Sequence, residues 1–515
     1  MQYDIILITG EVYFDHPLCG IAIIKRLLEK NNYSVGLIEQ PTTEKEIIAL
    51  GKPKLFFGVS SGSVDSMIRN YTPLKKKRED DEFSKSYGSI PDRADLVYSN
   101  WLKKNFKDTT IVLGGTEATL RRFAHFDYWH NKLKKPILFD SKTTIIAYGS
   151  AEKQILEIAE KIKNKKSLVG IEGTCIISKE VPKNFIQLPT FEEVSESKKK
   201  FMDMQLQFSN KKNLAQKIDN RYLLQYKMPI YKPKDLDEYY ELPFTRKVPL
   251  YLRGFEFSVV THRGCIGKCN FCSLNLTQGN KIISRSEESI IREISNITKL
   301  STFRGNIDDL GGPSANMYGM DCDLCQLDNC LNCKQLNRTN TRLINLLREL
   351  KKIKNVKNIF IRSGVRFDLC SDEYIKELKN HIYDTLKIAP EHVNKEQLKL
   401  MNKDYGNMNS FIKKFDKFIK NKKLSFYFIT AHPGSTLKDA RALANSLKYL
   451  ENSDSVQIFT PTPMTNSTAM YYTGLDLKKN KIYIPYTYRE KKDQKNIIFK
   501  SKKYNSTKNN RKDYK

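Results

Sequence analysis

Three cysteines lie close together on one short stretch, from Thr261 to Ser273, whose sequence is THRGCIGKCNFCS. Cys265, Cys269 and Cys272 follow the spacing CxxxCxxC. Thiolates so spaced can hold three corners of a [4Fe–4S] cube, and since such clusters usually have four Cys ligands, one iron would stay open to a non-protein ligand. Zinc prefers a closed set of four N or S ligands and suits this loop less well. We therefore predict an iron–sulfur cluster with one open position, where chemistry would take place.

A second group of cysteines forms two CxxC pairs inside the segment 321–333, at Cys322, Cys325, Cys330 and Cys333. Two such pairs are a strong metal signal. Four thiolates close the ligand shell, so we expect either structural zinc or an auxiliary [4Fe–4S] cluster at this second site.

The charge and composition of the chain limit which partners and which cellular compartment we expect. The chain has 88 Lys and Arg against 58 Asp and Glu, a net charge of +30. This excess raises the question of an RNA or DNA partner, although a general Lys bias explains it equally well. Ten Cys, mostly at ligand spacings, favour a reducing compartment. The start MQYDIILITG carries no basic leader, and no stretch approaches a membrane span, so we expect a cytoplasmic protein without a membrane partner.

The first part of the chain alternates apolar runs with helical patterns, which predicts a parallel sheet. The runs lie at 3–9, 33–38, 55–59, 110–113 and 144–148. We expect a flavodoxin-like domain over residues 1–170, with an insertion at 72–92. Such sheets bind ligands at the carboxyl ends of their strands. Here those ends carry small residues, which either admit a ligand or simply make turns: Thr9-Gly10, Ser60 to Ser63, Gly114-Gly115 and Gly149.

The middle and last parts of the chain predict a connecting region and a second domain. Residues 171–253 are rich in proline and are expected to form a region that connects the two domains and covers them. Six strand candidates separated by helical patterns then predict a partial (βα)6 TIM-like barrel over 254–475, with the Cys-rich insertion at 321–333. The segment 476–515 is strongly basic and is expected to form a tail of one or two helices that fade into disorder.

Every predicted strand of the second domain ends in residues that are capable of chemistry, and catalytic residues of parallel barrels lie at those ends. After the Cys loop come Gly311-Gly312-Pro313, Ser363 to Arg366, Ala389 to His392, Ala431 to Gly434 and Thr460 to Pro463.

The Cys spacing, with Phe271 directly before the third Cys, resembles the signature of radical S-adenosylmethionine (SAM) enzymes. This resemblance implies that SAM binds the open iron and is cleaved reductively to a 5'-deoxyadenosyl radical, which abstracts hydrogen from a substrate. It places Phe271 near the adenine and Gly311-Gly312 at the amino group, where Pro313 replaces a common Glu. Four further residues become candidates for cofactor or substrate contacts: Ser363, Arg366, Glu391 and His432.

The whole chain is similar to the YgiQ-like radical SAM proteins, a family with no assigned reaction. The similarity rests on ILITGEVYFDHPLCG, LGGTEATLRRFAHFDYW, IRSGVRFDL, LKIAPEHV, AHPGSTLKDA and PTPMTNSTAMYYTG. It implies a radical enzyme with an unidentified substrate and a reducing partner such as flavodoxin or ferredoxin. Two alternatives stay open: an RNA-modifying enzyme similar to methylthiotransferases, and a non-catalytic iron–sulfur binding protein.

The first domain also resembles the cobalamin-binding domains that precede some radical SAM barrels. Those with a His ligand to cobalt use Asp-x-His-x-x-Gly after the first strand, whereas here Asp15 and His16 are adjacent. A carboxylate at that spacing does not orient the imidazole in the same way. We therefore expect that cobalamin is not required.

Overall fold

The computed structural model of the protein describes residues 2–78, 90–322, 330–448, 450 and 455–509. The chain forms two compact units, each of which is described by itself. The first unit comprises Met1–Glu256 with the short segments Leu276–Gly279 and Thr462–Thr473. The second unit comprises Phe257–Asn275, Asn280–Pro461 and Gly474–Lys515.

The first unit is built on a nine-stranded sheet whose first five strands are parallel. Their order is β2-β1-β3-β4-β7, and they pair in register, with Ile5 opposite both Val35 and Phe56. The apolar runs at the chain start therefore form the predicted strands: β1 (Ile5–Thr9), β2 (Val35–Glu39), β3 (Phe56–Ser60), β4 (Thr110–Leu113) and β7 (Ile145–Ala147). Helices cover both faces of such a sheet, so every residue of β1 is buried.

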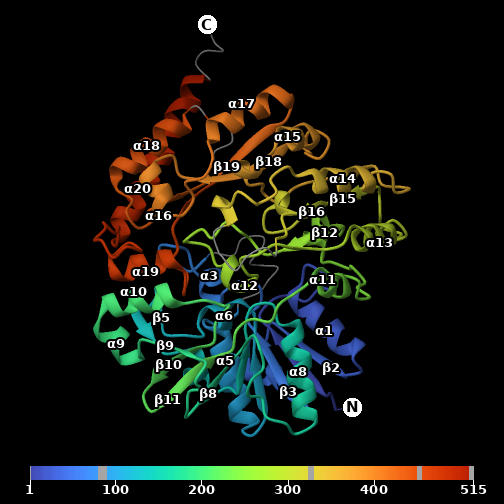
Figure 1. The fold of residues 1–515 in the computed structure, drawn as a ribbon, viewed down its shortest axis with the longest axis vertical. Helices are drawn as coiled ribbons and strands as arrows, with labels where there is room; N and C mark the ends of the chain where they lie inside the picture. Colours follow the sequence, from blue (N-terminus) through green and yellow to red (C-terminus); the bar gives the residue numbers. More distant parts are fainter. Residues whose placement is uncertain (1, 79–89, 323–329, 449, 451–454, 510–515) are drawn as a thin grey trace. The chain divides into compact units, whose positions relative to one another are not determined.

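Four more strands extend this sheet, and they come from the region expected to be a connection. They are β8 (Thr174–Ser178), β9 (Ile186–Leu188), β10 (Leu214–Ile218) and β11 (Arg221–Gln225), in the order β8-β11-β10-β9. Figure 1 shows them, teal to green, continuing the blue part of the sheet. The expectation that 171–253 is only a connecting region was wrong. These strands contain buried polar residues, which interrupt the apolar pattern by which a strand is recognised in the sequence. Gln216 in β10 is fully buried and accepts a hydrogen bond from the Ala124 amide at 3.0 Å.

The helices of the first unit lie on both faces of the sheet. Crossovers between parallel strands are almost always right-handed, and the chain moves in opposite directions from β1 to β2 and from β2 to β3, so α1 and α2 are expected on opposite faces. Helix α1 packs against α8, and α5 packs against α2 and α7. The helices are α1 (Gly20–Lys30), α2 (Glu44–Ile47), α3 (Ser66–Asn70), α5 (Ala94–Asn105), α6 (Gly115–Leu120), α7 (Ile137–Ser141), α8 (Glu152–Lys163), α9 (Phe191–Glu196), α10 (Lys198–Gln207), α11 (Pro233–Tyr240) and α19 (Asn466–Thr473). A short hairpin, β5 (His125–Asp127) and β6 (Lys132–Lys134), lies beside α19.

The second unit contains parallel strands at all six predicted positions. Strand β12 pairs with β16, β15 pairs with β17, and β18, β19 and β20 form one ladder (Figure 1). A parallel bridge between Val365 and Ile388 joins the β17 segment to β18. Neighbouring strands thus follow the chain order, and their carboxyl ends share one edge. The strands are β12 (Ser258–Val260), β15 (Asn306–Ile307), β16 (Asp309–Gly311), β17 (Asn358–Ile359), β18 (Thr385–Glu391), β19 (Lys423–Thr430) and β20 (Ser455–Ile458).

Amphipathic helices cover these strands and share one apolar core with them. Helix α13 begins at a Ser286 cap and turns Ile290, Ile294 and Ile297 inward. None of the helices in the described ranges has the length and hydropathy needed to cross a bilayer. The helices of this unit are α13 (Glu287–Ile297), α14 (Thr341–Leu350), α15 (Asp372–Leu378), α16 (Lys395–Leu400), α17 (Met408–Phe418), α18 (Leu437–Leu447) and α20 (Tyr488–Asn509), and the short α12 (Leu274–Thr277) is divided between the two units.

The C-terminal segment is more than a tail, because α20 packs against α18 and β20. Its Gln494 side chain is buried and accepts hydrogen bonds from the Ala431 amide at 3.0 Å and the Ser435 hydroxyl at 2.8 Å. The same amide group donates to the Ser435 carbonyl at 2.8 Å. Helix α20 is of the kind expected for the start of this basic segment, and its buried Ile498 also belongs to the apolar core of the unit.

Candidate active site

The three cysteines of the first motif lie on one loop of the second unit, between β13 (His262–Arg263) and α12. All three are free thiols and are half-buried. The loop begins at Gly264, whose φ of +86° is a left-handed value, and a Cβ there would overlap the Lys281 carbonyl. The Gly267 amide approaches the Cys265 sulfur at 3.4 Å. Only glycine fits the start of this loop, so the backbone fixes where the first thiol stands.

The other side of the Cys loop is held by the end of α16. The Asn270 amide donates to the Met401 carbonyl at 2.9 Å, and its side chain donates to the Leu400 carbonyl at 2.8 Å. The Asn402 side chain returns a bond to the Lys268 carbonyl at 2.8 Å. Three hydrogen bonds thus position the loop over the segment that follows β18.

Two of these thiols, Cys265 and Cys272, are buried enough to resist ionisation by themselves. Burial raises the pKa of Cys265 and raises that of Cys272 to about 12. No three His, Cys, Asp or Glu side chains in the described ranges gather as the ligands of a single metal ion do. A cube that binds each thiolate through a different iron needs no such close grouping. Cysteine thiolates are the protein ligands that [4Fe–4S] clusters use.

The two glycines after β16 are explained by packing inside the unit. A Cβ on Gly312 would lie 2.6 Å from the Cε1 atom of the buried His262 ring. The Gly311 carbonyl accepts hydrogen bonds from the Thr261 amide at 2.8 Å and the Thr261 hydroxyl at 3.2 Å. The Ser363 hydroxyl donates to the Asp309 carboxylate, and the Ser363 amide bonds the same group at 3.1 Å. Ser363 is thus engaged by Asp309, which the sequence did not single out.

Arg366 and Glu391 lie beside the Cys loop, and both are buried. Arg366 forms a two-pronged ion pair with Asp368 and places its Nη1 atom 3.9 Å from the Cys269 sulfur. Glu391 has a φ of +69° and is 5% exposed, and its Oε2 atom has no hydrogen-bond partner in the described part of the chain. Burial raises the pKa of Glu391 to about 7, although Lys403 and Arg366 oppose the rise. A strained, unsatisfied carboxyl at a strand end is an expected feature of a ligand site.

Phe271 and His432 make ring contact beside the same loop. Their ring centroids are 6.5 Å apart in an edge-on arrangement, and His432 also packs against Phe459 at 5.1 Å. Burial lowers the pKa of His432 to about 3, so its imidazole is neutral at physiological pH. The two rings form an apolar wall rather than a charged one.

The second group of cysteines lies only partly within the described residues. Cys325 lies outside them, whereas Cys322, Cys330 and Cys333 are half-buried free thiols. Leu331 and Ile266 belong to one apolar cluster, against which Cys265, Cys330 and Cys333 pack. The Cys-rich insertion therefore packs against the Cys loop.

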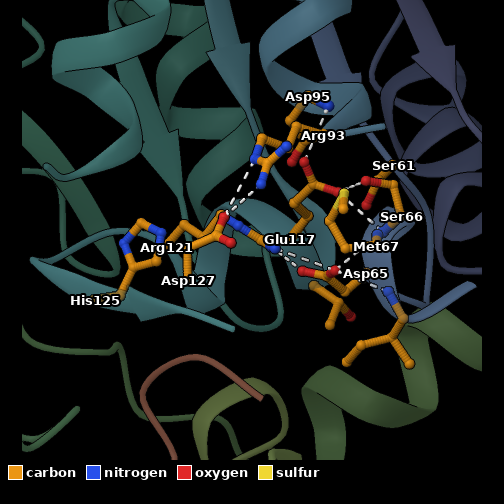
Figure 2. Close-up of polar contacts among 12 residues, drawn as sticks. Ser61, Asp65, Ser66, Met67, Arg93, Asp95, Glu117, Arg121, His125 and Asp127 are labelled. Carbon is orange, nitrogen blue, oxygen red and sulfur yellow. Dashed lines mark hydrogen bonds and ion pairs between the residues drawn. The ribbon is translucent and has the colours of Figure 1, made fainter. Parts of the chain in front are cut away.

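The first unit carries a separate buried polar network at the carboxyl end of its strands (Figure 2). Asp65 caps α3 by accepting from the Met67 amide at 3.0 Å, and it pairs with the fully buried guanidinium of Arg121. Glu117 accepts from the Ser66 amide at 3.0 Å and from the Ser66 hydroxyl. The segment after Gly114-Gly115 is largely interior, with Arg121, Arg122, His125, Asp127 and Tyr128 buried.

Asp95 in this network is a buried carboxyl without a counter-ion. Neither of its oxygens accepts a hydrogen bond from a described residue, although the Ser61 and Ala118 amides lie near. Burial, with the neighbouring Glu117 carboxyl second, raises the pKa of Asp95 well above its ordinary value of 3.8. Glu117 accepts several hydrogen bonds as an anion would, so Asp95 carries the proton.

Replacing Asp95 by Asn is therefore expected to flatten the pH dependence of stability. The native state holds the Asp95 proton above pH 3.8 and the unfolded state does not, so the unfolding free energy of the wild type falls as pH rises. The loss is about 1.4 kcal/mol for each unit by which the pKa is raised. Urea unfolding at a series of pH values from 4 upward, followed by tryptophan fluorescence, measures the unfolding free energy of the wild type and of Asp95→Asn. A variant with the wild-type slope would contradict a protonated Asp95.

Both units match known protein families. Residues 1–256 match the family described as Radical SAM N-terminal, and residues 259–447 match the Radical SAM superfamily. UPF0313 protein MJ1155 of Methanocaldococcus jannaschii is 40% identical over 539 residues, which cover 96% of this chain and 89% of that protein. UPF0313 protein FN0734 of Fusobacterium nucleatum is also 40% identical, covering 97% of this chain and 96% of that protein.

Solved structures with a similar fold include two radical SAM enzymes. TsrM from Kitasatospora setae, a radical SAM methyltransferase solved with cobalamin and a [4Fe–4S] cluster, covers 90% of this chain and 74% of its own, with a TM-score of 0.56 at 13% identity. OxsB, a cobalamin-dependent SAM radical enzyme solved with aqua-cobalamin, covers 97% of this chain and 56% of its own, with a TM-score of 0.52 at 13% identity. At this identity the likeness concerns the mixed α/β fold alone.

Proposed function

The chain belongs to the UPF0313 family and is a radical SAM enzyme, and from this premise we propose that Cys265, Cys269 and Cys272 hold its [4Fe–4S] cluster. The observation that carries the proposal is the position of three free thiols on one anchored loop, at the carboxyl-end edge of the parallel strands. Three protein ligands leave one iron for SAM. Anaerobic reconstitution with iron and sulfide, followed by iron analysis after gel filtration, tests the assignment.

The cluster and SAM, when bound, supply a one-electron cleavage that generates an organic radical. The chain's own residues provide the surroundings. Phe271 and His432 offer an apolar wall, and neutral His432 adds no charge there. Glu391 offers a buried acceptor for a cationic or hydroxyl group of the ligand. Ser363 is proposed to support the strand end through its hydrogen bonds to Asp309.

Replacing Glu391 by Gln is expected to weaken SAM binding by about 10-fold to 100-fold. A hydrogen bond to a charged group contributes about 1.5–3 kcal/mol, and every 1.4 kcal/mol changes an affinity tenfold. Equilibrium dialysis of radiolabelled SAM against reconstituted protein measures the affinity. The matched control is Glu396→Gln, because Glu396 lies on the exposed face of α16. Equal affinities in Glu391→Gln and wild type would remove Glu391 from the ligand site.

The electron must come from outside the chain, because radical SAM enzymes need a reducing partner. We propose a small electron-transfer protein of the flavodoxin or ferredoxin kind. The second Cys set, including Cys325 outside the described residues, is proposed to hold structural zinc or an auxiliary cluster. The strand order β2-β1-β3-β4-β7 supports a flavodoxin-like core in the first unit, and the six parallel strands of the second support a partial barrel.

Cobalamin-dependent radical methylation is the second candidate function. The fold likeness to TsrM and OxsB favours it, so the expected absence of cobalamin has no support from the comparisons. The structure bears only on the axial ligand. His16 is buried, its Nε2 atom lies 2.9 Å from the Glu256 carbonyl oxygen, and its Nδ1 atom accepts from the Leu18 amide at 3.1 Å. Both ring nitrogens are engaged, so we propose that His16 is not a cobalt ligand.

Hydroxocobalamin added during purification distinguishes these possibilities. We expect no stoichiometric corrin absorbance after gel filtration. If corrin co-elutes with the wild type and equally with His16→Ala, cobalamin binds without this ligand and radical methylation becomes the leading function. If corrin co-elutes only with the wild type, the argument from the His16 hydrogen bonds is wrong.

A further inference from the structure

Arg366 places a charged side chain within 4 Å of a Cys-loop sulfur, and an ion pair already orients its guanidinium. Its Nε and Nη2 atoms donate to the two Asp368 carboxylate oxygens at 3.0 and 2.7 Å. This fork leaves Nη1, which lies 3.9 Å from the Cys269 sulfur. Asp368 therefore orients the Arg366 guanidinium so that its Nη1 atom faces the Cys loop.

The Cys loop is shaped to receive this guanidinium. A Cβ on Gly267 would lie 2.5 Å from the Arg366 Nη1 atom, so a larger residue at position 267 would displace the guanidinium. The Tyr405 ring lies 6.0 Å from the guanidinium, and the Tyr405 hydroxyl donates to Asn402 at 3.2 Å. Asn402 in turn bonds the Lys268 carbonyl of the loop.

The backbone of Arg366 is fixed from a different strand end. The buried Asn316 side chain, which follows β16, accepts from the Arg366 amide and donates to its carbonyl, both at 2.9 Å. Asn340 donates to the Asn316 carbonyl at 3.1 Å. The guanidinium is thus held in place before any ligand binds, which is the arrangement expected of a residue that acts through its charge.

A cluster on three thiolates gains one further negative charge when a one-electron donor reduces it. Because both Arg366 and Asp368 are only 5% exposed, solvent screens them poorly. A guanidinium against a ligand sulfur favours the more negative state, and a carboxylate behind it opposes that effect. Hydrogen bonds to the sulfurs and local charge are the means by which proteins set cluster potentials.

We propose that Arg366 is a positioning residue that raises the reduction potential of the Cys-loop cluster, and that Asp368 both aims Arg366 and limits this rise. The inference rests on the proposed function, since it requires the cluster on Cys265, Cys269 and Cys272. It gives Arg366 a different role from the substrate or SAM contact that its motif implied.

Redox titration of the reconstituted full chain, followed by electron paramagnetic resonance of the reduced cluster, tests this pair. Arg366→Gln is expected to shift the midpoint potential to more negative values, and Asp368→Asn to more positive values. The control Arg362→Gln removes the same charge from an exposed position on the same segment and is expected to leave the potential unchanged. Opposite shifts are decisive because structural damage at this site would not reverse sign between the two variants.

Two results would overturn the inference: an unchanged potential in Arg366→Gln, or shifts of the same sign in both variants. If Arg366→Gln does not retain a cluster, Asp368→Asn and Arg366→Lys, which keep the cation, decide the question. A positive shift in Asp368→Asn with a near-native potential in Arg366→Lys supports the inference, and any other pair of results overturns it. Failure of the wild type to load a cluster would instead refute the proposed function.

Discussion

Cys269→Ala protein, reconstituted anaerobically and passed through gel filtration, is expected to retain almost none of the iron that the Cys loop holds. The substitution leaves two thiolates for a cube that needs three protein ligands. Loss of an outer-shell partner alone lowers metal affinity by about 10-fold to 100-fold, and loss of a ligand costs more. Iron and acid-labile sulfide per chain measure the effect.

Iron bound by the second Cys set would obscure this result, so the comparison is made in its absence. The background variant replaces Cys322, Cys325, Cys330 and Cys333 by Ala, and it is expected to lose the second metal while keeping the first cluster. Cys175→Ala serves as a control because Cys175 is a buried thiol in β8 of the first unit. Equal iron in Cys269→Ala and Cys175→Ala would contradict the assignment of the Cys loop.

Asp65→Ala is expected to lower the unfolding free energy of the first unit by about 3–5 kcal/mol. The substitution leaves the Arg121 guanidinium buried without its anion, which is the costly way to break an internal ion pair. It also removes the cap of α3, worth about 1 kcal/mol. The two tryptophans of the chain, Trp101 and Trp129, both lie in the first unit. Urea unfolding followed by tryptophan fluorescence therefore measures this unit selectively.

The double variant Asp65→Ala with Arg121→Met separates charge from packing. It removes both charges and fills the space with an apolar side chain of similar length, so most of the loss is expected to be recovered. Asp65→Asn retains the cap and is expected to fall between the wild type and Asp65→Ala. A double variant no more stable than Asp65→Ala would show that the cost comes from shape rather than from the unpaired guanidinium.

The parts of the fold that the sequence predicted well depend on local patterns. The Cys spacing lies on one loop, and the buried runs that form β1, β3 and β19 need only an apolar period to be recognised. Strand β10 was not predicted because its Gln216 is buried and hydrogen-bonded to distant backbone groups, which no local pattern shows.

The candidate site shows the same division between local and distant information. The strand ends were located correctly, but the partners of their side chains come from other strands. Ser363 is engaged by Asp309, and Gly312 is small because His262 packs on it. Asp368 was overlooked although it stands only two residues after Arg366, because a nearby carboxylate on a loop is usually solvated. Its burial became evident only from the fold.

The most direct test of the account is the fate of SAM in the reconstituted wild-type protein. With dithionite as electron donor and no added substrate, we predict the release of 5'-deoxyadenosine, quantified by liquid chromatography with mass spectrometry. We predict none from the variant in which Cys265, Cys269 and Cys272 are all Ala. Protein that binds the cluster and SAM yet releases no 5'-deoxyadenosine, or a triple variant that releases as much as the wild type, would contradict the account.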